Sequence, residues 1–132
     1  EYSELHDKLA KELAVSLASR YLEQAQYEER HGKWSSAALS WSKVCEGRPD
    51  DSMAHMRAAN ALLEAKGDLH RAQQLAQRAL ELRGESADIR RLLGRVYIAA
   101  GLKLNARREL MMAIAIDPKD TLAQSLLAQI KD

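Results

Sequence analysis

The sequence predicts an all-α fold, a solenoid of antiparallel helix pairs, and two observations carry this prediction. First, the residue pattern repeats with a period of 34 residues over most of the chain. Second, glycine or proline interrupts the helical pattern wherever a helix or a pair of helices must end. Counting back 34 positions from Gly94, Gly101, Ala106 and Ala113 gives Asn60, Gly67, Ala72 and Ala79. Because three of these four residues recur unchanged, the pattern is typical of a repeat array.

Three helix pairs are expected along the chain. Gly32, Gly67 and Gly101 each lie inside a pair, where a left-handed turn ends the first helix at little steric cost. Pro49 and Pro118 separate successive pairs, because proline removes a hydrogen-bond donor and disfavours helix at the preceding residue. The expected helices span residues 18–31, 34–47, 53–66, 69–83, 87–100 and 103–116. The repeat units are residues 18–52, 53–86 and 87–120.

Residues 1–17 do not match the repeat but carry a helical pattern of their own. Leu5, Leu9 and Leu13 recur every fourth residue with charged residues between them. No breaker separates this extension from the first unit, so one helix can run from about residue 3 to residue 31, either straight or with a kink near residues 16–19. The leucines either pack onto the chain's own repeats or form a self-association or interdomain surface, and the sequence leaves both open.

Residues 121–132 begin a fourth unit in register with the third. Leu122, Leu126, Leu127 and Ile130 form one apolar stripe, as in a helix that covers the last pair. The segment is therefore either a capping helix or a truncated fourth repeat, and the pattern fits both.

The repeat resembles the tetratricopeptide repeat (TPR), and the resemblance covers residues 18–120. It rests on the small residues at fixed places, on Gly94 and Tyr97 in one helix, and on Pro118 after the next. The resemblance implies a right-handed superhelix that serves as an interaction scaffold. It also implies core positions for four aromatic residues, namely Tyr21, Trp34, Trp41 and Tyr97.

The same resemblance implies that the first helix of each unit lines a concave groove, which binds a peptide or helix of a partner protein. The predicted groove residues are Leu22, Gln26, Arg57, Ala61, Arg91, Leu92, Arg95 and Ile98. Arg57 and Arg91 are one period apart and Arg95 follows one helical turn later, so we expect a cationic strip. Guanidinium groups pair well with carboxylates, which favours an acidic or acidic-amphipathic partner segment. The alternative is that these arginines are ordinary solvated helix residues.

Members of the family that bind the acidic C-terminus of cytosolic chaperones use a clamp of lysine, asparagine and arginine. The corresponding places here hold Leu22, Gln26, Ala58, Asp88 and Leu92. We therefore do not expect binding of a chaperone tail by that clamp.

No catalytic or metal-binding pattern stands out. The four histidines are scattered, no pair has the i, i+4 spacing, and none has a cysteine beside it. Cys45 lies on the inward stripe of its helix, which predicts a buried, inert thiol. The sequence has no glycine-rich phosphate loop. We expect no enzyme activity, cofactor, metal or small-molecule substrate.

Composition narrows the function classes further. The net charge of +1 gives no field that attracts nucleic acid, so RNA binding ranks last. No apolar run is long enough to insert into a membrane, and the single cysteine excludes an internal disulfide. We therefore expect a soluble, cytoplasmic protein. The first residue is Glu1 rather than methionine, which favours a fragment of a longer chain.

Overall fold

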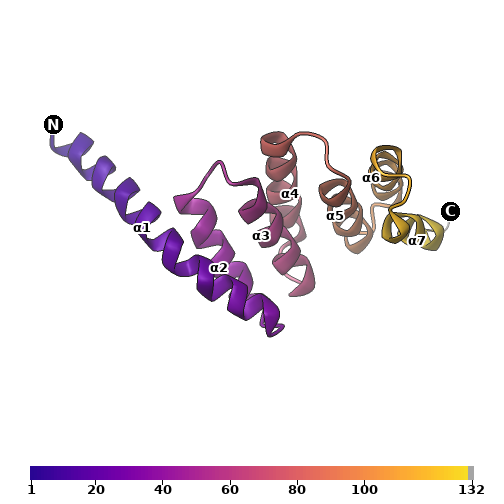
Figure 1. Cartoon of the computed structure of the whole chain (residues 1–132), viewed down its shortest axis with the longest axis horizontal. Coiled ribbons are helices and arrows are strands. Elements are labelled where there is room, and N and C mark those ends of the chain that lie inside the picture. The colour runs from indigo at the N-terminus through magenta and orange to yellow at the C-terminus, as the bar shows by residue number, and fades with distance from the viewer. Residues whose placement is uncertain (131–132) are drawn as a thin grey trace.

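The computed structural model describes residues 1–130, which contain seven helices and no strand. The helices follow one another along the long axis of the molecule (Figure 1). Their bounds are α1 Tyr2–Arg30, α2 Trp34–Gly47, α3 Ser52–Glu64, α4 Leu69–Arg83, α5 Ala87–Ala99, α6 Lys103–Ile116 and α7 Thr121–Gln129. The predicted all-α solenoid of helix pairs is confirmed, and α1 is a single helix, as the sequence predicts.

Small residues let the two helices of each pair approach closely. Ala25, Ala37, Ala72 and Ala106 have no exposed surface. In the third pair, a Cβ added at Gly94 would lie 2.7 Å from Leu110 Cδ2, so only glycine fits there without a shift of Leu110. The sequence pattern therefore identifies the residues that set the spacing inside each pair.

The aromatic residues contribute to the core, as the resemblance implies. Trp41 and Tyr97 are buried in the main hydrophobic core, and Tyr21 and Trp34 are half-buried against that core. The Nε1 donor of Trp41 is buried and has no hydrogen-bond partner among the described residues. These side chains are packed into the array, and Trp41 keeps only a small exposed area, which faces the depression between α1, α2 and α3.

The turns inside the pairs share one hydrogen-bonding pattern but not one residue type. Gly32 and Gly101 have positive φ angles of 68° and 77°, as predicted. Between α3 and α4 the prediction is wrong, because Lys66, with a φ of 56°, takes the left-handed conformation in place of Gly67. The backbone N–H groups of Lys66 and Gly67 donate to the carbonyls of Leu63 and Leu62, a pattern that also occurs at Gly101. The first helix of the second unit therefore ends one residue earlier than a count of 34 residues back from the third unit predicts.

An acidic or hydroxyl side chain caps the first helix of each later unit. Asp51 accepts a hydrogen bond from the Ala54 N–H, Ser86 from the Ile89 N–H, and Asp120 from the Ala123 N–H. These caps fix where α3, α5 and α7 begin.

The C-terminal helix α7 packs on α5 and α6 and buries Ala123. Leu126, Leu127 and Ile130 are half-buried against the cluster of Leu110, Ala113 and Ala123. Leu122, by contrast, is 62% exposed and does not belong to the predicted stripe. The prediction for residues 121–132 extends to two residues that lie outside the described part of the chain.

Candidate functional site

The first helices of the units line three adjoining depressions. One, of about 480 Å³, lies between α1, α2 and α3 and is lined by Leu22, Gln26 and Arg57 among others. The next, of about 260 Å³, lies between α3 and α5. The third, of about 310 Å³, lies between α3, α5 and α7. Arg57 lines the first two and Arg95 the last two, so the depressions form one continuous surface, which we call the groove. Seven of the eight predicted residues line it, namely Leu22, Gln26, Arg57, Arg91, Leu92, Arg95 and Ile98.

Ala61, the eighth predicted residue, has no exposed surface. Its side chain therefore cannot touch a bound segment, and it helps α3 pack against its neighbours instead. Leu92 is buried apart from the small area that it contributes to the central depression, whereas Ile98 is exposed.

At the boundary between the first two units, Arg57 of α3 reaches back to α1. Its Nη1 lies 2.6 Å from Glu29 Oε2. The Glu29 side chain is only 15% exposed, and its second oxygen, Oε1, is buried without a partner among the described residues. The pair therefore holds a largely buried carboxylate against a half-exposed guanidinium.

Arg95 of α5 makes a similar contact one unit later, although it lies one helical turn beyond Arg91, the residue one period after Arg57. Its Nη2 donates to Glu64 Oε1 of α3 at 2.6 Å, and its Nη1 donates to Asn60 Oδ1 at 3.1 Å. Glu29 and Glu64 each lie near the C-terminal end of the first helix of a unit. An acidic residue at this place thus pairs with an arginine of the next unit at both boundaries.

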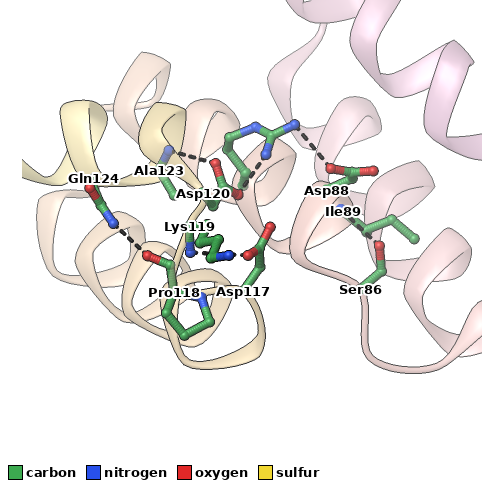
Figure 2. A network of polar contacts seen from close by, with 10 residues as sticks. Ser86, Asp88, Ile89, Asp117, Pro118, Lys119, Asp120, Ala123 and Gln124 are labelled. Carbon is green, nitrogen blue, oxygen red and sulfur yellow. Dashed lines mark hydrogen bonds and ion pairs between the residues drawn. The ribbon is translucent and has the colours of Figure 1, made fainter.

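Arg91 reaches in the opposite direction, toward the C-terminal helix. Its Nη1 donates to Asp120 Oδ2 at 2.6 Å, and its Nη2 donates to Asp88 Oδ1 at 3.2 Å. Figure 2 shows Asp88 and Asp120 on either side of this guanidinium, with Asp120 also bound to the backbone of Ala123. One buried carboxylate therefore both caps α7 and binds α5.

In the structure, each arginine of the expected cationic strip forms an ion pair with a carboxylate outside its own helix. The sequence pattern did not predict the partners of these arginines, which are Glu29, Glu64, Asp120 and Asn60. The sequence carries a signal for two of these pairs, because a glutamate recurs near the C-terminal end of the first helix in two successive units, at Glu29 and Glu64. Two arginines nevertheless keep exposed surface, 43% of the Arg57 side chain and 35% of the Arg95 side chain.

The predicted self-association residues lie far from the groove. Leu5, Leu9 and Leu13 are all more than half exposed, on the part of α1 that extends beyond α2 (Figure 1). They do not pack onto the repeats. Contact with α2 begins further along α1, where Gly47 lies so close to Ala14 and Ala18 that an added Cβ would be 2.5 Å from Ala18 Cβ.

A second polar network lies away from the groove. Arg90 donates to Glu109 of α6 at 2.8 Å and to Glu85 in the loop before α5 at 2.7 Å. The hydrogen bond from Arg90 lowers the pKa of Glu85, and the two carboxylates together raise the pKa of Arg90. This network ties the two helices of the third unit to the preceding loop and is structural.

Neither Cys45 nor any group of metal-binding side chains among residues 1–130 has the properties of a reactive site. Cys45 is buried, and desolvation raises the pKa of its thiol to about 12, so the thiolate needed for a nucleophile or metal ligand does not form near neutral pH. Among residues 1–130 no cluster of three or more histidine, cysteine or acidic side chains has the arrangement of a metal site. In the same part of the chain, no helix is both long enough and apolar enough to cross a membrane.

Comparison with solved structures places this helix arrangement among known folds. The second TPR domain of human RPAP3, in complex with the HSP70 peptide SGPTIEEVD, is 16% identical, with a TM-score of 0.81 over 90% of this chain and 98% of that one. The first TPR of Spaghetti (RPAP3), bound to the HSP90 peptide SRMEEVD, is 17% identical, with a TM-score of 0.79 over 87% and 90%. The Yersinia enterocolitica chaperone SycD, in complex with a YopD peptide, is 13% identical, with a TM-score of 0.75 over 85% and 90%.

At these identities the likeness shows the fold alone. No curated protein matches the sequence. The family model described as tetratricopeptide repeat matches residues 63–130, which is more than half of the chain. With the 34-residue pattern and the stacked helix pairs, this match assigns the family: the chain belongs to the tetratricopeptide repeat family.

Proposed function

We propose that the protein is a non-catalytic interaction scaffold whose groove binds a peptide or helix of a partner protein. The observation that carries the proposal is the continuity of the three depressions, which Arg57 and Arg95 join into one surface along the first helices. An elongated surface of this kind suits an elongated ligand, and TPR arrays use such surfaces for recognition.

The groove offers charge and apolar surface side by side. A guanidinium has five N–H donors, and Arg57 uses one on Glu29, so donors remain for a ligand carboxylate. Met56 and Leu92 line the central depression, and Ile98 lines the next. We therefore propose an acidic or acidic-amphipathic segment, whose carboxylates share the arginines with Glu29 and Glu64 and whose apolar side chains contact Ile98 and Leu92.

The relatives of known structure support an acidic peptide but not the same peptide. The RPAP3 domains were solved with peptides that end in EEVD. In this chain Leu22, Gln26, Ala58, Asp88 and Leu92 occupy the places of the chaperone-tail clamp, and Ala58 is fully buried. We propose that the ligand is an acidic segment other than a chaperone tail held by that clamp. The cytoplasm is the compartment we propose, since the one cysteine is an unpaired thiol.

The test selects ligands from a display library of random 12-residue peptides and then measures their affinity for variants. The proposal expects selected peptides to be rich in Asp, Glu and large apolar residues. It expects Arg95→Gln and Ile98→Ser each to weaken binding about tenfold, while the matched changes Arg83→Gln and Leu104→Ser, at exposed positions of α4 and α6, leave affinity unchanged. Thermal unfolding of each variant separates lost binding from lost fold. Selected peptides whose affinity is unaffected by both groove changes would overturn the proposal.

A further inference from the structure

The N-terminal part of α1 forms an arm, residues 1–17, most of which lies outside the repeats. Every residue from Glu1 to Leu13 is exposed, and α1 continues without a break into the first unit. The arm nevertheless carries large apolar side chains, and Tyr2, Leu5, Leu9 and Leu13 are all more than half exposed. Such a row on a water-facing helix lacks the partner surface that it would normally bury.

Helical geometry places these side chains in one narrow stripe. At about 100° per residue, Tyr2 lies about 20° to one side of Leu9, while Leu5 and Leu13 lie about 40° to either side. Ser16, about 20° from Leu9, ends the stripe with a small residue. Leu9 is therefore the centre of the stripe around the helix, with Tyr2 and Ser16 each seven residues away from it.

Opposite charges lie together on one edge of this stripe. Glu12 lies about 60° from Leu9, and Lys8 about 100° from it on the same side. His6 and Ala10 occupy the other edge. All four residues are exposed. A partner helix therefore matches this edge when it places an acidic residue beside Lys8 and a basic residue beside Glu12.

We propose that the partner of the arm is the arm of a second copy of this chain, with the two helices antiparallel about a two-fold axis at Leu9. In this arrangement Leu9 faces Leu9, and Leu5 faces Leu13 of the second copy. The edge that carries Lys8 and Glu12 meets the same edge of the second arm in reverse, so each lysine lies beside the glutamate of the other copy. A parallel pair would instead place this edge against His6 and Ala10, which offers no such charge match.

The stripe is short, and this sets the expected strength. Tyr2 to Ser16 spans about 21 Å at 1.5 Å per residue, so the buried area falls at the low end for specific interfaces. The dimer is therefore weak and dissociates on dilution in the micromolar range. This inference does not depend on the proposed peptide groove, which lies on other residues.

Charge reversal combined with mixing tests the register. Lys8→Glu makes positions 8 and 12 both acidic, and Glu12→Lys makes them both basic, so sedimentation equilibrium should find each variant weakened at least tenfold in dimerisation. An equimolar mixture should recover the dimer, because each heterodimer restores both lysine–glutamate pairs. Circular dichroism of each variant checks that the arm stays helical. A native chain that is monomeric up to about 1 mM, or a mixture that does not recover, overturns the proposal.

Cross-linking tests the two-fold axis independently. Leu9→Cys in oxidised glutathione should give a disulfide-linked dimer, because the two positions face each other on the axis. Val15→Cys is the matched control, since Val15 is equally exposed but lies about 120° from Leu9. Cys45 is buried and stays out of the reaction. Equal cross-linking of both variants would contradict the proposed face.

Discussion

Arg57 and Glu29 are 28 residues apart in the chain, yet Arg57 Nη1 and Glu29 Oε2 lie 2.6 Å apart across the boundary between two repeats. The same relationship joins Arg95 to Glu64 at the next boundary, with the same 2.6 Å distance. Neighbouring units of a solenoid stack through apolar interfaces, to which these pairs add directional contacts. These pairs fix the position of each unit relative to the one before it, on the side where the groove lies.

The Arg57–Glu29 pair should stabilise the folded state more than an ordinary surface ion pair does. We expect a double-mutant cycle with Arg57→Gln and Glu29→Gln, measured by urea unfolding, to give a coupling of about 1 kcal/mol. The reason is that the Glu29 side chain is largely buried and loses the one partner that it has among residues 1–130. Arg78 and Glu81, an exposed pair within α4, serve as the control, with a coupling below about 0.5 kcal/mol. Equal couplings would show that the boundary pair is no stronger than a solvated one.

Asp120 has two separable roles, which two substitutions distinguish. Asp120→Asn keeps an oxygen that accepts the Ala123 N–H but loses the charge that Arg91 binds. Asp120→Ala loses both, and the cap alone is worth about 1 kcal/mol. We expect the alanine variant to be the less stable in thermal unfolding and to lose amide protection at the start of α7. Identical stabilities would mean that the cap contributes nothing.

Gly94→Ala should destabilise the third unit by about 1–3 kcal/mol, even though alanine is the better helix former. The added Cβ would lie 2.7 Å from Leu110 Cδ2, inside a closely packed pair. Because the obstacle is a side chain, the cost of Gly94→Ala should shrink in a Leu110→Ala background. Chemical denaturation of the single and double variants measures this, and a cost unchanged by Leu110→Ala would place the strain elsewhere.

The raised pKa of Cys45 predicts that the free energy of unfolding depends on pH in the alkaline range. Burial raises its pKa from 9.0 to about 12, so the folded chain keeps the thiol protonated where the unfolded chain ionises it. The folded state is therefore favoured by the neutral thiol below about pH 9 and loses stability as the pH rises from 9 toward 12.

Cys45→Ala isolates this contribution, since tyrosines and lysines titrate in the same window but are present in both chains. We expect the difference in unfolding free energy between the two proteins to narrow as the pH rises. At pH 8, iodoacetamide should label the native thiol far more slowly than the thiol in urea. A difference in stability that is constant with pH would contradict the raised pKa.

The helix pairs are predictable from sequence because their causes are local. Glycine turns, proline stops and alanines at packing positions each act within a few residues, so Gly32 and Gly101 were located correctly. The second unit differs because Lys66 adopts a conformation that favours glycine, which nothing in its neighbourhood indicates. Its first helix matches that of the third unit at an offset of 35, with Ala59 rather than Asn60 as the buried counterpart of Gly94.

The electrostatics of the groove could be predicted only in part. That Arg57, Arg91 and Arg95 share one face follows from helical periodicity. Their nearest carboxylates, on Glu29, Asp120 and Glu64, lie 28 to 31 residues away in the chain. These contacts depend on how far a long side chain reaches across a boundary. Periodicity fixes direction, whereas these contacts depend on the distance between units, which the sequence pattern does not contain.

The unbroken course of α1 has a consequence for how two copies would bind. The arm and the first helix of the first repeat are one continuous helix, α1. Two arms paired at Leu9 would therefore hold the two grooves at a set separation, related by the two-fold axis. A partner that carries the recognised segment twice would bind both grooves, and the second contact would be intramolecular. Such a partner gains avidity only when its spacer spans that separation. The length of a single helix would then select partners by spacing as well as by sequence.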